Sequence, residues 1–309
     1  MAAIATAVAA IATVAVLAAA APSASAYSPP PVIAWETLLP GLPTSSNPQF
    51  HGVPGCATAT MACIDTEIHG LDALRRRLRC DHRAVFATTY ELLTGALRDA
   101  MRANPHLFVD PAWVIGEDAT FADMYLNVVA GYEHHRPIPA AWQIAFATAR
   151  RGDANAVEDM LLGINAHVQR DMPHMIAAVG VRAPDGTSHK RDHDVFNEVL
   201  NHAYERVVDT IAQRFDPIEN LIAPRASQLL GLLGNALGDQ LVQSWREEVW
   251  RHAELLLGAA TPLGAQLAGV TIEVGAASWA TLIAAFQLPP GYRAQRDAYC
   301  AVHNVGPLS

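Results

Sequence analysis

Histidine and aspartate side chains spaced four residues apart are the pairs that could do chemistry in this chain of 309 residues. His167 and Asp171 have this spacing, which places both on one face of a helix. Met160 and Ile164 lie on the same face, since helical positions advance by about 100° per residue. We therefore expect His167 and Asp171 to point into the core, where an isolated carboxylate is costly and needs a partner or a metal ion.

Further candidate ligands occur on two other segments with a helical pattern. Asp192 and His193 fall on the apolar stripe of the segment from Arg191 to Arg214. His135 falls on the stripe of an earlier helix. Nitrogen and carboxylate ligands of this kind suit zinc or another divalent ion. The amide side chains expected to support such ligands by hydrogen bonds are Asn165, Asn197 and Asn201.

Two interpretations of these residues remain open. In the first, His167, Asp171 and His193 hold a divalent metal, zinc above all, and His135 or Asp192 completes the set. The metal would activate water to hydrolyse an ester or phosphoester in a small-molecule or lipid-like substrate. Asp192 is the best candidate for a catalytic base if it is not a ligand. In the second, the cluster is a structural polar network in a non-catalytic bundle that binds a small apolar ligand or a protein partner.

A helical pattern runs through most of the chain, and strand-like alternation is nearly absent. Asp118 is expected to cap a helix that reaches His134. Asp153 is expected to cap a long helix that reaches about Val179, with a kink at Pro173. Other residues of the types that begin or end helices are Asp110, Pro111, Pro139 and Gly152. We predict an all-α fold, a multi-helix bundle.

The N-terminus has the pattern of a secretory signal peptide. Residues 1–21 carry no charged side chain, and Ala24-Ser25-Ala26 is a cleavage motif. An uncleaved anchor is the alternative, since about 20 apolar residues can span a bilayer. We predict cleavage after Ala26 and a secreted or cell-envelope protein. The expected organisation is a signal peptide (1–26), an extended arm rich in Pro, Ser and Gly (27–64), a helical core domain (65–217) and a C-terminal helical extension packed on it (218–309).

The four cysteines are expected to form disulfides if the protein is exported. They are an even number, so we expect two disulfides in an oxidising compartment. Three pairings are possible, and free buried cysteines are the alternative. The pairing that we favour joins neighbours in a short loop and ties the C-terminal tail to an early helix. It consists of Cys56–Cys63 and Cys80–Cys300.

Composition excludes several classes of protein. With 51% hydrophobic residues, the chain can bury enough apolar surface to fold. The 21 basic and 30 acidic residues leave a net charge of −9, so there is no basic excess for nucleic-acid binding. The apolar stretches Leu255–Ile272 and Val274–Tyr292 are interrupted by glycine and proline. We therefore expect no stable membrane span after signal cleavage.

The segment Gly163–Pro173, GINAHVQRDMP, resembles the signature N-A-H-(I/V)-x-x-D-(L/M)-P of a bacterial domain-of-unknown-function family that is common in actinobacteria. This resemblance covers about Asp65 to Pro217 and implies a helical domain with no established activity. A fainter resemblance is to secreted zinc-dependent phospholipases C and related nucleases, which are all-helical. Their His-x-x-x-Asp and His-x-x-x-Glu pairs are similar to His167-x-x-x-Asp171 and His193-x-x-x-Asn197, where Asn replaces Glu.

Overall fold

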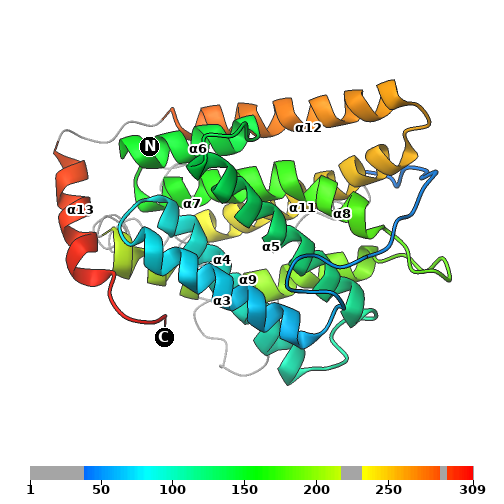
Figure 1. Ribbon diagram of the computed structural model, residues 1–309, viewed down its shortest axis with the longest axis horizontal. Helices are drawn as coiled ribbons and strands as arrows, with labels where there is room; N and C mark the ends of the chain where they lie inside the picture. Colours follow the sequence, from blue (N-terminus) through cyan, green and yellow to red (C-terminus); the bar gives the residue numbers. More distant parts are fainter. Residues whose placement is uncertain (1–37, 217–231, 286–290, 309) are drawn as a thin grey trace, which may run out of the picture. The chain divides into compact units, whose positions relative to one another are not determined.

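The computed structural model describes residues 38–216, 232–285 and 291–308, and every regular element in these ranges is a helix (Figure 1). The predicted all-α class is therefore confirmed. The predicted signal peptide lies outside the described residues. In chain order the elements are α3 (Met61–Leu78), α4 (Arg83–Ala103), α5 (Pro111–Glu133), α6 (Ala140–Arg151), α7 (Ala156–Asn165), the π-helix η1 (Ala166–Asp171), α8 (Met172–Val179), α9 (Lys190–Phe215), α11 (Leu232–Gly258), α12 (Pro262–Ile283) and α13 (Tyr292–His303).

Local sequence signals explain where several helices begin and end. The carboxylate of Asp110 accepts a hydrogen bond from the backbone N–H of Trp113, and Pro111 stands at the first position of α5, where no N–H is needed. Gly152 ends α6 in the left-handed conformation, at φ 69°. Glycine adopts this conformation without the steric penalty of a side chain. These starts and ends agree with the expectation from residue types.

Two expected helix starts are wrong. Asp118 lies in the interior of α5, because the pair formed by Asp110 and the following proline already begins that helix upstream. The helix expected from Asp153 begins instead after Asn155, whose side chain accepts a hydrogen bond from the backbone N–H of Glu158. The Glu158 carboxylate accepts one from the backbone N–H of Asn155 in return. This reciprocal capping box satisfies two N–H groups, whereas an Asp alone satisfies one.

The kink expected at Pro173 takes the form of one wide helical turn. In η1, the N–H of Met172 bonds to the carbonyl of His167, five residues back rather than four. Proline has no N–H, so the ordinary helical hydrogen bond from position 173 is impossible. Single π-turns inside helices are frequent at functional sites. This turn contains both His167 and Asp171.

Helix α4 forms the centre of the core and is buried along most of its length. It packs against α3, α9 and α7, while α11 packs against α8, and α12 packs against α6 and η1. The described residues belong to one compact unit. Helices α11 and α12 therefore cover the wide turn of η1. The aromatic residues whose rings surround the imidazole of His167 are Phe86, Tyr90, Phe121, Tyr125 and Trp142.

All four cysteines are paired as favoured from the sequence. Cys56 and Cys63 form a disulfide just before and within the first turn of α3. Cys80, between α3 and α4, is bonded to Cys300 in α13, across a sequence separation of 220 residues. Two disulfides are compatible with an extracellular or periplasmic protein.

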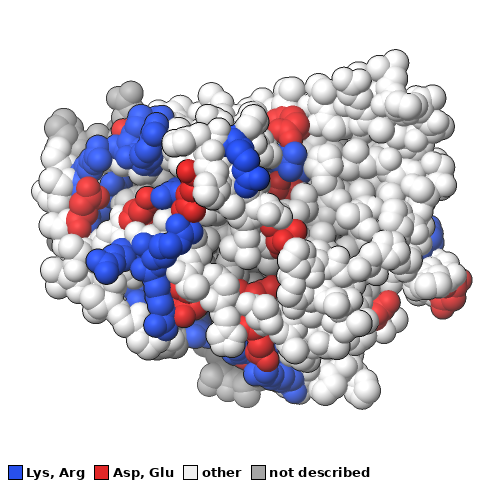
Figure 2. Space-filling model, viewed as in Figure 1, with Lys and Arg blue, Asp and Glu red and all other residues white. Residues whose placement is uncertain are grey.

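Helix α12 carries exposed apolar side chains on its outer face. The largest of these are Leu263, Leu267, Val270, Val274 and Leu282. The one charged residue of α12 is Glu273, which pairs with Arg170 of η1 at 2.5 Å. Figure 2 accordingly shows no charged side chain over the first half of this helix. Within the described ranges, no helix combines the length and the hydropathy that crossing a bilayer requires.

Candidate functional site

His167 and Asp171 are buried neighbours in η1, as their spacing predicts. The Nδ1 atom of His167 lies 3.2 Å from Oδ2 of Asp171. The indole Nε1–H of Trp142 donates to the same oxygen at 2.7 Å, and Arg170 donates to Oδ1 at 3.0 Å. Asp171 is therefore a buried carboxylate whose charge is compensated by three donors, as a buried anion requires.

The imidazole of His167 is oriented by these contacts. Its ring stacks on Phe121 with a centroid separation of 3.4 Å, and the ring of Tyr90 lies 4.8 Å away. Burial lowers the pKa of His167, although the charge of Asp171 opposes the shift. With Nδ1 directed at Asp171, the other ring nitrogen, Nε2, is buried and has no hydrogen-bond partner among the described residues. A neutral imidazole in this tautomer presents a lone pair at Nε2.

A pair of buried acids lies between α3 and α5. Burial, followed by the charge of Asp118, raises the pKa of Glu67 far above its ordinary value. Burial also raises the pKa of Asp118, so the pair retains a proton at neutral pH. The two carboxyl groups share this proton in a hydrogen bond, and outside the pair neither oxygen of Glu67 nor Oδ2 of Asp118 has a hydrogen-bond partner within the described part of the chain. Such orphaned polar atoms call for an explanation, of which an ion is one.

Tyr90 of α4 connects these acids to His167. Burial raises the pKa of its phenol well above the ordinary value, and the charges of Asp118, Glu67 and Glu117 add to the shift in that order. These acids are therefore near enough to act electrostatically on Tyr90, whose ring also contacts His167. The Tyr90 hydroxyl is buried and likewise has no partner in the described ranges.

Asp192 and His193 are buried as expected, but they do not approach His167 as ligands. The carboxylate of Asp192 accepts the backbone N–H groups of Val109 and Asp110, at 2.8 and 2.7 Å, and so holds the loop before α5. Arg246 of α11 donates to the carbonyl of His193 at 2.7 Å and lies 3.3 Å from its Nδ1 atom. Burial and the charge of Arg246 lower the pKa of His193 well below its ordinary value.

His135 does not point into the bundle. It is exposed, lies beyond the last residue of α5 and has a positive φ of 54°, so the helical extrapolation that placed it on the inward stripe is wrong. Among the expected supporting amides, buried Asn165 donates to the carbonyl of Ala276 in α12 at 2.9 Å. Asn197 and Asn201 are half-buried on α9.

The five residues expected to bind a metal are therefore dispersed over several environments. In residues 38–216, 232–285 and 291–308, no three His, Cys, Asp or Glu side chains already stand together as a ligand set. The sequence interpretation missed Glu67 and Asp118. Glu67 lies on the same helical stripe as Ile64, Leu71 and Leu74, which is the signal that marks an inward-facing acid.

Comparison with known proteins gives one result. A model of a family of unknown function (DUF5995) matches residues 64–286. The match begins next to Asp65, where the resemblance was expected to begin, and continues well past Pro217, where it was expected to end. No curated protein and no solved structure matches the chain. Because the match covers most of the chain, the protein belongs to this family, DUF5995, whose function is unknown.

Proposed function

We propose that the protein is an exported, divalent-metal-dependent hydrolase in which Glu67, Asp118 and His167 move together to bind the ion, since they do not stand as a ligand set in the described residues. The substrate class is an ester or phosphoester. Export is supported by the signal-like N-terminus and by the two disulfides. The metal site is supported by one observation above all: the buried Nε2 atom of His167 has no partner among the described residues, and the oxygens of Glu67 have none outside the pair with Asp118.

The contact between His167 and Asp171 has the form that supports a metal-binding histidine. Such histidines usually donate one ring N–H to a carboxylate, which fixes the tautomer and leaves the other nitrogen for the ion. Asp171 therefore acts here as the orienting carboxylate, not as a ligand. Its own charge is already compensated by Trp142 and Arg170.

The pair of acids supports the same assignment. Glu67 and Asp118 retain a proton because two carboxylates cannot both be charged in a buried site. A divalent ion would replace this proton and compensate both charges, so metal binding should release protons. Carboxylate oxygen and imidazole nitrogen together suit zinc, manganese or iron.

Residues around the site would assist hydrolysis. A bound metal ion would supply an activated water and polarise the scissile bond. Burial, opposed by the charge of Arg246, raises the pKa of Glu117 to about 7, which suits a group that accepts and donates protons near neutral pH. The Tyr90 hydroxyl can donate a hydrogen bond to an oxygen that gains negative charge.

The test is the metal content of the mature protein, purified without chelators. Elemental analysis is expected to find zinc, manganese or iron in stoichiometric amount, and calorimetric titration should detect proton release. Glu67→Gln keeps the shape of the neutral acid and should fold, but it should bind metal at least roughly tenfold more weakly. The control is His82→Ala, which removes an equally buried histidine paired with Asp159 at 2.5 Å.

Hydrolysis is measured separately with p-nitrophenyl acetate and p-nitrophenyl phosphate. Activity on one of these probes should disappear with a chelator and return with added zinc. If wild-type protein carries no metal and binds none of the three ions on titration, the proposal is refuted. The buried acids and His167 then form a structural network in a non-catalytic bundle that binds an apolar ligand or a protein partner.

A further inference from the structure

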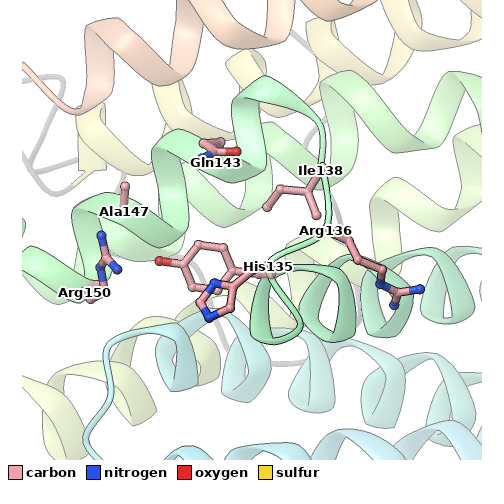
Figure 3. A pocket seen from close by; sticks show the side chains of 7 residues that line it. His135, Arg136, Ile138, Gln143, Ala147 and Arg150 are labelled. Atoms are coloured by element: carbon pink, nitrogen blue, oxygen red, sulfur yellow. The ribbon is translucent and has the colours of Figure 1, made fainter.

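A surface pocket of about 320 Å³ lies between the end of α5 and helix α6 (Figure 3). Its lining combines positively charged, hydrogen-bonding and apolar groups. The lining residues that matter here are Tyr132, His135, Arg136, Ile138, Gln143 and Arg150. Small-molecule sites have this character, with an apolar wall and a few polar groups that fix the ligand. Its volume lies at the lower end of the range for small-molecule sites.

Positive charge in this pocket is not compensated by the protein. None of the described residues that line it is acidic. Neither Arg136 nor Arg150 forms an ion pair within the described residues, whereas the adjacent Arg151 pairs with Asp153. Glu133, which lies between the lining residues Tyr132 and His135 in the sequence, already pairs with Arg77 at 2.6 Å. In a chain with a net charge of −9, an uncompensated basic pocket favours an anionic ligand.

Two further groups add hydrogen-bonding capacity. The hydroxyl of Tyr132 is buried, and no described residue serves as its hydrogen-bond partner. His135 adopts a positive φ of 54°, a conformation that costs free energy for a residue with a side chain and that recurs at ligand sites. In Figure 3, His135 and Arg150 lie on the same side of the pocket, while the guanidinium of Arg136 points away from both.

We propose that this pocket binds a small organic phosphate. The guanidinium of Arg150 can donate two parallel hydrogen bonds to phosphate oxygens, as arginine does in many phosphate sites. The hydroxyl of Tyr132, the imidazole of His135 and the amide of Gln143 supply further donors. Ile138 offers an apolar surface for the organic part. A phosphate dianion is attracted more strongly by this uncompensated positive charge than a singly charged carboxylate, with Arg150 meeting it directly and Arg136, whose guanidinium points away, acting at longer range.

This pocket is independent of the proposed metal site. Asp118 lies in α5, and His135 comes 17 residues later, just beyond the end of that helix. At the rise of an α-helix, this places the two residues roughly 25 Å apart along the helix axis. None of the proposed metal ligands lines the pocket. Phosphate binding and metal binding can therefore be tested, and can fail, separately.

Isothermal titration calorimetry with phenyl phosphate, inorganic phosphate and benzoate tests the assignment, with sodium chloride at matched ionic strength. Phenyl phosphate should bind more tightly than inorganic phosphate, and benzoate should bind more weakly than either. Arg150→Ala should weaken phenyl phosphate binding roughly tenfold. Tyr132→Phe, which removes only an unpartnered oxygen and should fold normally, should weaken it severalfold.

The matched control is Arg151→Ala, which removes the neighbouring exposed arginine and should leave binding unchanged. Equal weakening by Arg150→Ala and Arg151→Ala would show general charge attraction and overturn the proposal. So would phenyl phosphate binding no tighter than benzoate, or no binding of phenyl phosphate at millimolar concentration.

Discussion

Replacing Asp171 by alanine should destabilise the protein strongly. Asp171 is 0% exposed and accepts hydrogen bonds from the Trp142 indole at 2.7 Å and from Arg170 at 3.0 Å, and it faces Nδ1 of His167 at 3.2 Å. Alanine leaves the indole N–H and the imidazole N–H buried without an acceptor. Arg170 is affected less, because it is partly exposed and retains Glu273.

The magnitude follows from the number of donors that lose their acceptor. An unsatisfied buried donor costs about 1–3 kcal/mol, so two of them should lower the free energy of unfolding by roughly 2–6 kcal/mol. For a domain of this size, 1 kcal/mol corresponds to about 2–4 °C, so the melting temperature should fall by on the order of 10 °C. Asp171→Asn should have a smaller effect, since its amide oxygen can still accept from Trp142.

Thermal melting followed by circular dichroism, together with urea unfolding, measures these changes. Asp153→Ala is the control, because Asp153 is exposed and pairs with an exposed arginine, and its effect should stay within about 0.5 kcal/mol. A melting temperature of Asp171→Ala equal to that of the wild type would refute the reasoning. It would mean that the contacts of Asp171 with Trp142 and His167 do not contribute to folding.

Two further predictions concern an acid and a glycine. Burial, opposed by the charge of Arg246, raises the pKa of Glu117 from 4.5 to about 7. Between these two pH values the native state holds a proton that the unfolded state releases. The free energy of unfolding should therefore fall as pH rises through this range. Urea unfolding at about pH 5 and pH 7 should show a smaller fall for Glu117→Gln than for wild type, and identical falls would contradict the shift. Gly163→Ala would place a Cβ atom 2.3 Å from Phe86 and should destabilise by about 1–3 kcal/mol. Its control is Gly275→Ala, where nothing lies within 4 Å and stability should rise slightly; equal melting temperatures for the two variants would argue against the close packing of α7 on α4.

Helical periodicity predicted the residues that lie within one regular segment. His167 and Asp171 meet because four residues make about one turn, and this holds even in a π-turn. His135 shows the limit of the method. The helix ends at Glu133 and the chain turns through a left-handed conformation, so an angle extrapolated from the helix has no meaning two residues later.

Contacts between distant segments could not be predicted from periodicity. His193 faces inward as expected, but its partners are Glu117 of α5 and Arg246, which comes from a helix 53 residues further along the chain. Asp118 carried a misleading signal, since aspartate favours helix starts and the true start lay at Asp110. Glu67 was recognisable as a carboxyl on an apolar stripe, but only the fold shows that it faces Asp118.

The bond between Cys80 and Cys300 also determines how the protein responds to a pulling force. A force applied at points before residue 80 and after residue 300 passes through the disulfide and bypasses the chain between them. Helices α4 to α12 then bear no load, and only the segments outside the covalent ring can lengthen. Reduction of the disulfide would free the chain between the two cysteines, which are 220 residues apart in the sequence, to extend under force. The stretched chain would then become longer by roughly 750 Å. In an oxidising compartment, Asp118 and His167 lie inside this ring and are mechanically shielded, whereas Glu67, in α3, lies outside it and bears the load.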